Sequence, residues 1–293
     1  MVETAFFDVA VAGGSLRVAR FGSGPELVLG IHGITGSCMQ LVPLARCLGA
    51  GYSTLSPDLR GRGASNHLPG PYGMQAHADD CAAVLREFCG GPVVVVGESM
   101  GAYVAVVLAA RHPELVERLV LVDGGFTLSL PPGLDPQSVL EAVLGPALAR
   151  LDQVFPSPQA YFDFWRAHPA LVEEWSADLE DYFAYDLEPA EGGFRSRGRA
   201  EAVRADGSEH IVDPALTEQS LGALKCPVSL LRAPRNLLDQ PVPMLPDEAI
   251  APWRDVLPDF SDAMVENTNH YTLMFGERGV EQIAALATEK AGG

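Results

Sequence analysis

The chain has 293 residues, is 47% hydrophobic, and carries a formal net charge of -18 from 38 acidic and 20 basic residues. A chain of this length and composition can form one large domain with an insertion and bury a substantial core. The acidic excess repels phosphate backbones and anionic headgroups, so we expect neither nucleic acid nor an acidic membrane as a partner. We attribute the charge mainly to solubility.

The N-terminus and the cysteines indicate a cytoplasmic protein. The first residues, Met1-Val2-Glu3-Thr4, provide no positively charged start of a signal peptide, and no apolar run follows that could serve as a signal or cross a bilayer. The five cysteines are odd in number and contain no C-x-x-C pair. These features predict reduced thiols and no membrane segment.

The first half of the chain alternates between strand-like and helix-like segments. Short apolar or β-branched runs predict strands at 6–11, 15–21, 27–31, 52–56, 93–96 and 119–122. Helical spacing of apolar residues predicts helices at 39–48, 74–88 and 100–111. Strands and helices that alternate in this way predict a mostly parallel sheet covered on both faces.

The pattern changes near Phe126. From there to about Ala223 the chain is rich in proline and aromatic residues, with no signal for a buried strand; helices are predicted at 136–151, 158–167, 169–179 and 214–223. Strands return at 228–232 and 263–266, before a closing helix at 279–287. We therefore expect a core of residues 1–125 and 224–293, interrupted by a helical insertion at 126–223 that is too long to be a loop.

The strongest chemical signal is Gly97-Glu98-Ser99-Met100-Gly101, a G-x-S-x-G between a predicted strand and a predicted helix. In that context the serine occupies a strained turn that exposes its hydroxyl, and side chains at 97 and 101 would collide with neighbouring backbone. The helix that begins at Met100 directs free N–H groups toward the serine oxygen. We predict that Ser99 is a nucleophile rather than a helix-capping serine.

A serine hydroxyl needs an adjacent base at neutral pH, and His270 is the candidate. It lies in Asn267-Thr268-Asn269-His270-Tyr271, directly after the last predicted strand. The carboxyl ends of parallel strands meet at one edge of a sheet, so this loop projects from the same edge as Ser99. The other six histidines lie in a glycine loop, at a helix end or in polar surroundings, and have adequate structural explanations.

The third residue must orient the imidazole and stabilise its charged form. A chain order of serine, acid and histidine points to the loop after 228–232, where Asp239 is the carboxylate before the next proline-rich stretch. Asp123, at the end of the strand at 119–122, is the alternative, with Asp247 and Glu248 as lesser candidates. We favour Asp239, because an aspartate followed by two glycines is more often a loop-capping residue.

Acyl transfer also requires hydrogen-bond donors for the oxyanion that develops at the carbonyl. Two backbone N–H groups are the expected donors. One belongs to Met100, just after the nucleophile, and the other to Ile34 in the loop His32-Gly33-Ile34-Thr35-Gly36. No metal-ligand cluster, P-loop or dinucleotide fingerprint is present in the sequence, so we expect no metal and no cofactor.

Four segments together resemble the α/β-hydrolase superfamily, in its cap-bearing esterase/lipase-like branch: His32-Gly33, Pro57–Ser65, Gly97–Gly101 and Asn269-His270. The resemblance implies a mostly parallel central sheet flanked by helices, with a helical cap over Ser99. It also implies that Asp58–Ser65 is structural, with Arg60 and Arg62 holding the loop. One departure concerns the acid, since the family often has G-x-x-D after the acid-bearing strand and Asp239 comes later than that.

These residues predict a serine hydrolase that cleaves carboxylic esters of small to medium apolar molecules through an acyl-enzyme. We expect some aromatic residues of the insertion to pack it onto the core and the others to line an apolar pocket. A serine at position 99 argues against family members with an aspartate nucleophile, such as epoxide hydrolases. Thioesterases, biosynthetic tailoring hydrolases or cyclases, and C–C bond hydrolases share the Ser–His–Asp set and stay open as alternatives. A ligand receptor that retains the pocket is the non-enzymatic alternative.

Overall fold

The computed structural model describes residues 2–128, 145, 147–209 and 215–289. Within these residues, an eight-stranded sheet has the order β1-β2-β4-β3-β5-β6-β9-β10. The strands are β1 (Thr4–Val11), β2 (Gly14–Phe21), β3 (Glu26–Ile31), β4 (Tyr52–Pro57), β5 (Val93–Glu98), β6 (Val116–Val122), β9 (Val228–Arg232) and β10 (Phe260–Met264). The pairs β1–β2 and β2–β4 are antiparallel and the others are parallel, which confirms the predicted mostly parallel sheet.

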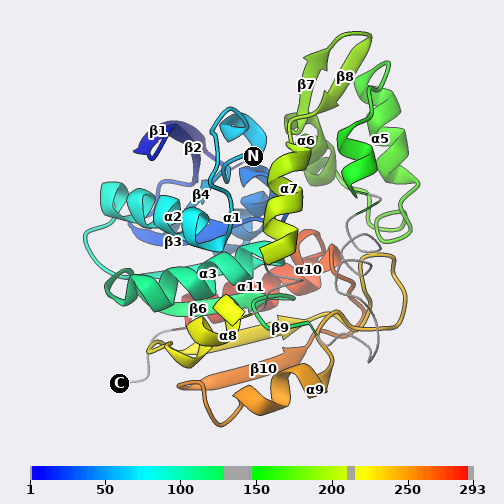
Figure 1. Cartoon of the computed structure of the whole chain (residues 1–293). Helices are drawn as coiled ribbons and strands as arrows, with labels where there is room; N and C mark the ends of the chain where they lie inside the picture. The colour runs from blue at the N-terminus through cyan, green and yellow to red at the C-terminus, as the bar shows by residue number, and fades with distance from the viewer. Residues whose placement is uncertain (1, 129–144, 146, 210–214, 290–293) are drawn as a thin grey trace.

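Helices cover both faces of this sheet (Figure 1). On one face, α2 (Met74–Phe88), α3 (Met100–Arg111) and α8 (Ala215–Gly222) pack side by side. On the other face, α1 (Val42–Leu48) and α10 (Thr272–Phe275) pack against α11 (Glu277–Thr288). Each face has its own cluster of buried apolar side chains. The valine run of β5 follows from this arrangement, because a central parallel strand is buried on both sides.

The segment between β6 and β9 differs in part from the expected helical insertion. It contains α5 (Pro158–Arg166), α6 (Ala177–Tyr185), α7 (Ala200–Gly207) and a hairpin of β7 (Leu187–Ala190) and β8 (Gly193–Ser196). The hairpin was not predicted, because its strands are short and only partly buried. The helix predicted at 169–179 is wrong: α6 begins after Ser176, whose side chain accepts a hydrogen bond from the Leu179 N–H as an N-cap. The helix predicted at 136–151 lies largely outside the described residues.

The inserted segment has an aromatic core of its own, which also contacts the sheet core. Tyr161, Trp165 and Phe183 are buried in it. Tyr182 packs against Phe275 of α10, with 5.1 Å between the ring centroids. These contacts place the inserted segment over the loop that follows β10.

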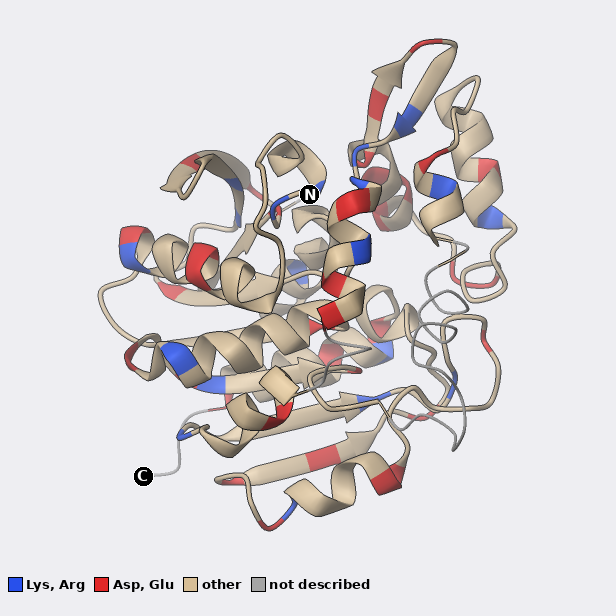
Figure 2. Ribbon diagram, viewed as in Figure 1, with Lys and Arg blue, Asp and Glu red and all other residues tan. Residues whose placement is uncertain are grey.

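Acidic residues lie on the helices of both the sheet core and the inserted segment (Figure 2). Ion pairs join the two parts; in one of them, the guanidinium of Arg46 in α1 lies 2.7 Å from the carboxylate of Asp178 in α6. Within the described ranges, no helix is both long enough and apolar enough to cross a membrane.

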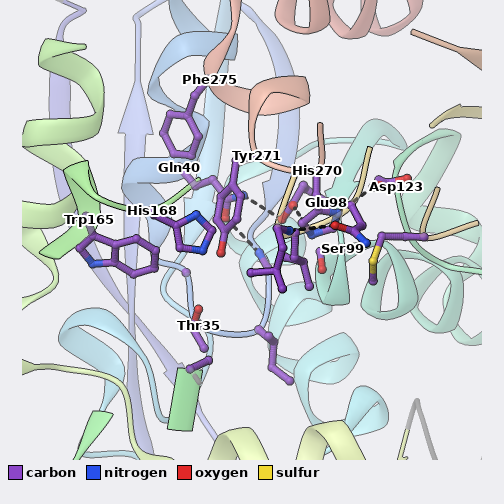
Figure 3. Close-up of a pocket in the computed structure, with 18 of the residues that line it drawn as sticks. Thr35, Gln40, Glu98, Ser99, Asp123, Trp165, His168, His270, Tyr271 and Phe275 are labelled. Carbon is purple, nitrogen blue, oxygen red and sulfur yellow. Dashed lines mark hydrogen bonds and ion pairs between the residues drawn. The ribbon is translucent and has the colours of Figure 1, made fainter. Parts of the chain in front are cut away.

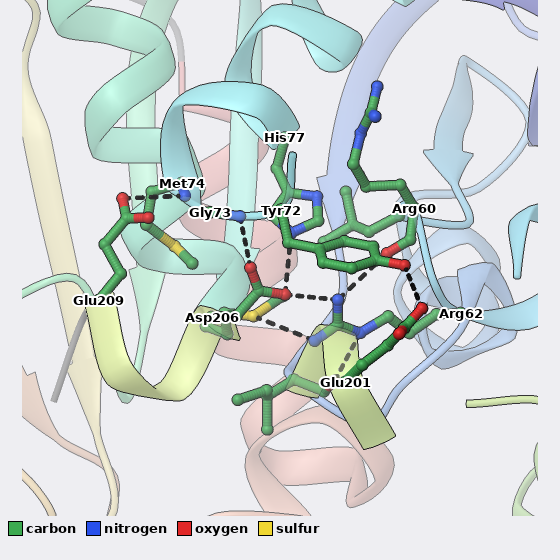
Figure 4. A network of polar contacts seen from close by, with 12 residues as sticks. Arg60, Arg62, Tyr72, Gly73, Met74, His77, Glu201, Asp206 and Glu209 are labelled. Carbon is green, nitrogen blue, oxygen red and sulfur yellow. Dashed lines mark hydrogen bonds and ion pairs between the residues drawn. The ribbon is translucent and has the colours of Figure 1, made fainter. Parts of the chain in front are cut away.

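A buried polar network holds the loop after β4, as expected for Arg60 and Arg62 (Figure 4). Arg60 Nη2 lies 2.7 Å from Asp80 Oδ1. Arg62 donates through Nη1 to Asp206 of α7, and His77 Nε2 lies 3.0 Å from the same carboxylate oxygen of Asp206. The loop after β4, the N-terminal half of α2 and the inserted helix α7 are thereby tied together.

We expect Arg62→Met to lower the free energy of unfolding by about 3 kcal/mol, because it removes the cation from a fully buried ion pair with Asp206. The matched control is Arg17→Met, which breaks a solvent-exposed pair with Asp8 and should cost less than about 1 kcal/mol. Urea denaturation followed by circular dichroism measures both. Equal losses in the two variants would contradict a special role for the buried pair.

Candidate active site

Strand register brings the predicted catalytic segments to one edge of the sheet. Ile31 at the end of β3 pairs with Gly97 of β5, and Glu98 pairs with Val122 at the end of β6. Val122 in turn pairs with Leu231 of β9. The loops that follow β3, β5, β6 and β9 therefore emerge at the same level. Ser99 and Asp123 are the first residues of two of these loops.

Ser99 occupies a sharp turn between β5 and α3. Its φ angle is +52°, in the left-handed region that a non-glycine residue rarely adopts. A Cβ at Gly97 would lie 2.4 Å from the carbonyl oxygen of Gly101, and one at Gly101 would lie 2.2 Å from that of Ile31. The predicted steric need for glycine at both positions is confirmed. The strained turn is the feature expected of an exposed nucleophile.

His270, in the loop after β10, contacts Asp123, the residue that follows β6. Its Nδ1 lies 2.7 Å from Asp123 Oδ2, and both side chains are buried. Asp123 is itself fixed, because Oδ1 accepts a hydrogen bond from the Ala233 N–H (3.3 Å) and its own N–H donates to the Leu231 carbonyl (2.8 Å). An ionised carboxylate can only accept hydrogen bonds, so His270 Nδ1 carries the proton that it donates to Asp123. The other ring nitrogen, Nε2, takes no part in this contact.

The preference for Asp239 as the partner of the imidazole is wrong. Asp239 Oδ1 accepts a hydrogen bond from Asn269 Nδ2 (2.8 Å), and Oδ2 accepts one from Arg235 Nη1 (3.2 Å). Asp239 therefore holds the residue before His270 and does not contact the ring. The physical reason is that β6 lies next to β5, the strand that ends before Ser99. The turn at Asp123, with φ +47°, then directs its carboxylate toward the imidazole.

Glu98 was missed in the sequence and lies in the middle of the site. It is buried, and its Oε1 lies 3.3 Å from His270 Nε2. Its Oε2 accepts a hydrogen bond from Gln40 Nε2 (2.8 Å), while Gln40 Oε1 accepts one from the Gly33 N–H (3.0 Å). The imidazole thus lies between two carboxylates. The sequence did contain a signal for Glu98: it is a charged residue at the end of an otherwise apolar strand, directly before Ser99.

These contacts affect the titration of His270 and Glu98. Burial lowers the pKa of His270, but the hydrogen bond to Asp123 and the charges of Glu98 and Asp123 outweigh it and raise the pKa above the usual 6.5. Burial raises the pKa of the Glu98 carboxyl above its usual 4.5. The imidazole therefore retains its proton to a higher pH than a free histidine does.

The two expected oxyanion donors lie at the site. A Cβ at Gly33 would lie 3.4 Å from the Cβ of Ser99, so the loop after β3 passes directly beside the serine. The Ile34 carbonyl accepts a hydrogen bond from Arg62 Nε (2.8 Å), and no described residue accepts one from the Ile34 N–H. Met100 is the first residue of α3, a position whose N–H has no partner within the helix. Both amides are therefore available to an oxygen above Ser99.

A cavity of about 290 Å³ opens over these residues (Figure 3). Ser99, Glu98 and His270 line one part of it, and Trp165 and His168 of the inserted segment line another. Much of the remaining lining is apolar or aromatic, as expected for a pocket that takes a small molecule. Among the described residues, no group of three or more His, Cys, Asp and Glu side chains could hold a metal ion.

Comparison with known proteins agrees with this architecture. A family model described as alpha/beta hydrolase fold matches residues 26–177. The chain is 38% identical over 109 residues to a 2-(acetamidomethylene)succinate hydrolase of Mesorhizobium japonicum, and 39% identical over 145 residues to the lipase LipV of Mycobacterium tuberculosis. The two matches cover 37% and 47% of this chain, and 39% and 54% of those relatives' own length.

Solved structures resemble the chain over nearly its whole length. A crystal structure of E-2-(acetamidomethylene)succinate hydrolase covers 97% of this chain and 98% of its own, with a TM-score of 0.79 and 23% identity. A thioesterase domain from the curacin biosynthetic pathway covers 99% of this chain and 100% of its own, with a TM-score of 0.75 and 20% identity. At these identities the likeness concerns the fold.

Proposed function

The chain belongs to the α/β hydrolase fold family, and on that premise we propose that it is a serine hydrolase that cleaves carboxylic esters through an acyl-enzyme. The observation that carries the proposal is the 2.7 Å contact between His270 Nδ1 and Asp123 Oδ2, at the same sheet edge as the strained turn of Ser99. We assign Ser99 as nucleophile, His270 as general base and Asp123 as the acid. Relatives named hydrolase and lipase support hydrolysis as the reaction class.

In the first half-reaction, Ser99 Oγ attacks the ester carbonyl while His270 Nε2 takes the hydroxyl proton. Asp123 keeps the imidazole in the tautomer with Nδ1 protonated and stabilises the imidazolium that forms. The N–H groups of Ile34 and Met100 donate to the oxyanion of the tetrahedral intermediate. His270 then returns the proton to the departing alcohol oxygen, and the acyl group stays on Ser99.

In the second half-reaction, water replaces the alcohol. His270 takes a proton from the water, the resulting hydroxide attacks the acyl carbonyl, and the carboxylic acid leaves as the proton returns to Ser99 Oγ. The same two amides stabilise the second oxyanion. The ester and one water are consumed, an alcohol and a carboxylic acid are released, and Ser99 and His270 return to their starting protonation states.

Two measurements test the proposal. A fluorophosphonate should label the protein in a one-to-one ratio, and peptide mass spectrometry should place the label on Ser99. p-Nitrophenyl esters from acetate to dodecanoate should be hydrolysed, with the optimum chain length reporting the size of the pocket. Labelling without turnover of any oxygen ester, but with turnover of thioesters, would replace esters by thioesters as the substrate class. Absence of labelling on a folded protein would overturn the serine mechanism.

A pH profile tests the role of Glu98. Because His270 must be neutral to accept the serine proton, its raised pKa predicts that kcat/KM of the wild type rises with pH through a value above 6.5. Glu98→Gln removes one of the charges that raise this pKa, so the acid limb should move to lower pH. Asp239→Asn is the matched control, since Asp239 does not contact the ring, and the acid limb of its profile should lie at the same pH as that of the wild type. An unmoved limb in Glu98→Gln would contradict the coupling.

A further inference from the structure

We propose that Arg150 holds a carboxylate of the substrate, so that the preferred ester carries a free carboxylate group. This inference rests on the proposed esterase function and names its substrate class. It replaces the expectation of an apolar ester, which was based on the aromatic content of the inserted segment.

Arg150 lines the same cavity as Ser99 and His270, although its side chain is only 2% exposed. Nη1 donates to Tyr161 Oη (2.5 Å) and to Asp186 Oδ2 (3.0 Å). The guanidinium carbon lies 5.0 Å from the ring centroid of Trp165, within range of a cation–π contact. These contacts fix the plane of the group and leave it little freedom to turn away.

The opposite edge of the guanidinium is unused. Nε is buried and has no hydrogen-bond partner among the described residues. These residues provide an acceptor for Nη1 and for no other nitrogen of the group. A buried donor without an acceptor is costly, so this edge is suited to a ligand that supplies one. The edge formed by Nε and Nη2 presents two parallel N–H groups, which match the two oxygens of a carboxylate.

The neighbours of Arg150 in the cavity add donors. His168 Nδ1 accepts a hydrogen bond from the Ala170 N–H (3.3 Å), so the proton of the neutral ring is on Nε2. Burial lowers the pKa of His168, which keeps the ring neutral and Nε2 a donor. Tyr182 and Tyr271 also line the cavity, and no described residue accepts a hydrogen bond from either hydroxyl. This set of donors is suited to an anion.

The anion site and the reacting groups belong to one cavity. The rings of His270 and Tyr271 have centroids 5.9 Å apart, and Tyr271 lies 5.3 Å from His168 and 6.4 Å from Trp165. In Figure 3, Trp165 and His168 lie at the end of the drawn site opposite Asp123. A substrate carbonyl at Ser99 can therefore extend a carboxylate away from the carboxylates of Glu98 and Asp123.

The net charge of the protein does not prevent this. The charge of -18 acts on an incoming anion mainly through exposed residues, whose fields solvent and salt screen over about 10 Å. A carboxylate in contact with a buried guanidinium is screened much less. A single carboxylate can bind because the donors of the cavity are fixed within contact distance of it. A polyanion would place its further charges near the acidic residues of the protein surface.

The decisive test compares charged and neutral esters of the same shape. The substrates are the monomethyl esters of succinate, glutarate and adipate, each paired with the methyl ester of its monoamide, with hydrolysis followed in a pH-stat. For at least one length, the wild type should favour the carboxylate by about tenfold or more in kcat/KM. Arg150→Met should bring the ratio of the two kcat/KM values, carboxylate ester over amide ester, close to one.

Arg166→Met is the matched control. Arg166 also pairs with a carboxylate, that of Glu180, and lies over an indole, 4.8 Å from the ring centroid of Trp175. It is not among the described residues that line the cavity, so the preference for the carboxylate should persist in this variant. If Arg150→Met does not fold, Arg150→Lys keeps a positive charge beside Asp186 but loses the paired donors, and should retain a reduced preference.

A binding measurement separates this inference from the esterase proposal. Isothermal titration calorimetry of glutarate into Ser99→Ala should give binding, and the double variant with Arg150→Met should lose it. If no ester is hydrolysed and Ser99 is not labelled, the esterase proposal fails, while binding that depends on Arg150 would still support the anion site. A wild type that prefers the amide esters at every length, together with no glutarate binding, would overturn the inference.

Discussion

Replacing Ser99 by alanine is expected to lower kcat for p-nitrophenyl butyrate by about 10⁶-fold. The methyl group cannot form the acyl-enzyme, so what remains is water attack assisted by the amides of Ile34 and Met100. The effect should be on kcat rather than on KM, since the rest of the cavity is intact. Steady-state kinetics on the purified variant, with active-site titration of the wild type, measures the loss.

The control for Ser99→Ala is a serine of similar burial whose role is structural. Ser157 caps α5 by accepting a hydrogen bond from the Ala160 N–H, so Ser157→Ala should cost about 1 kcal/mol of stability and leave kcat unchanged. Thr35 also lines the cavity and carries a hydroxyl. If Ser99→Ala kept most of its activity and the fluorophosphonate label appeared on Thr35, Ser99 would not be the nucleophile.

The sequence was sufficient for features that depend on local steric and topological rules. The turn at Ser99 was predictable because Gly97 and Gly101 are the residues that such a turn requires, and because a valine strand precedes it. His270 was predictable because parallel strands bring their carboxyl ends to one edge. The sheet itself followed from the alternation of strands and helices. None of these inferences needs the position of a distant side chain.

The contacts that complete the site do depend on distant side chains. Asp123 and Asp239 both follow strands at the correct edge, and chain order does not decide which carboxylate faces the imidazole. The structure decides it through the adjacency of β6 to β5, with Asp123 Oδ2 2.7 Å from His270 Nδ1. Similarly, the pairing of Glu98 with Gln40, and that of Arg150 with Asp186, join segments whose proximity exists only after folding.

Replacing Asp123 by asparagine is expected to have the second largest effect on kcat, after Ser99→Ala. Asp123→Asn should lower kcat by about 10⁴-fold, because an amide can donate to Nδ1 and thereby favour the tautomer whose proton is on Nε2. In that tautomer the imidazole cannot take the proton of Ser99. The fold should persist, since asparagine has nearly the same shape and its oxygen can still accept the hydrogen bond from the Ala233 N–H.

Asp239→Asn is the paired comparison, with the same chemical change at the other loop. Its contacts are to Arg235 and to Asn269, and the pair with Arg235 is about one-third exposed, so we expect kcat to fall by less than about fivefold. Assaying both variants over a range of pH separates a lost tautomer from a shifted titration, because only the latter is recovered at another pH. Large losses in Asp239→Asn and small ones in Asp123→Asn would mean that the loop after β9 rearranges during catalysis and supplies the acid.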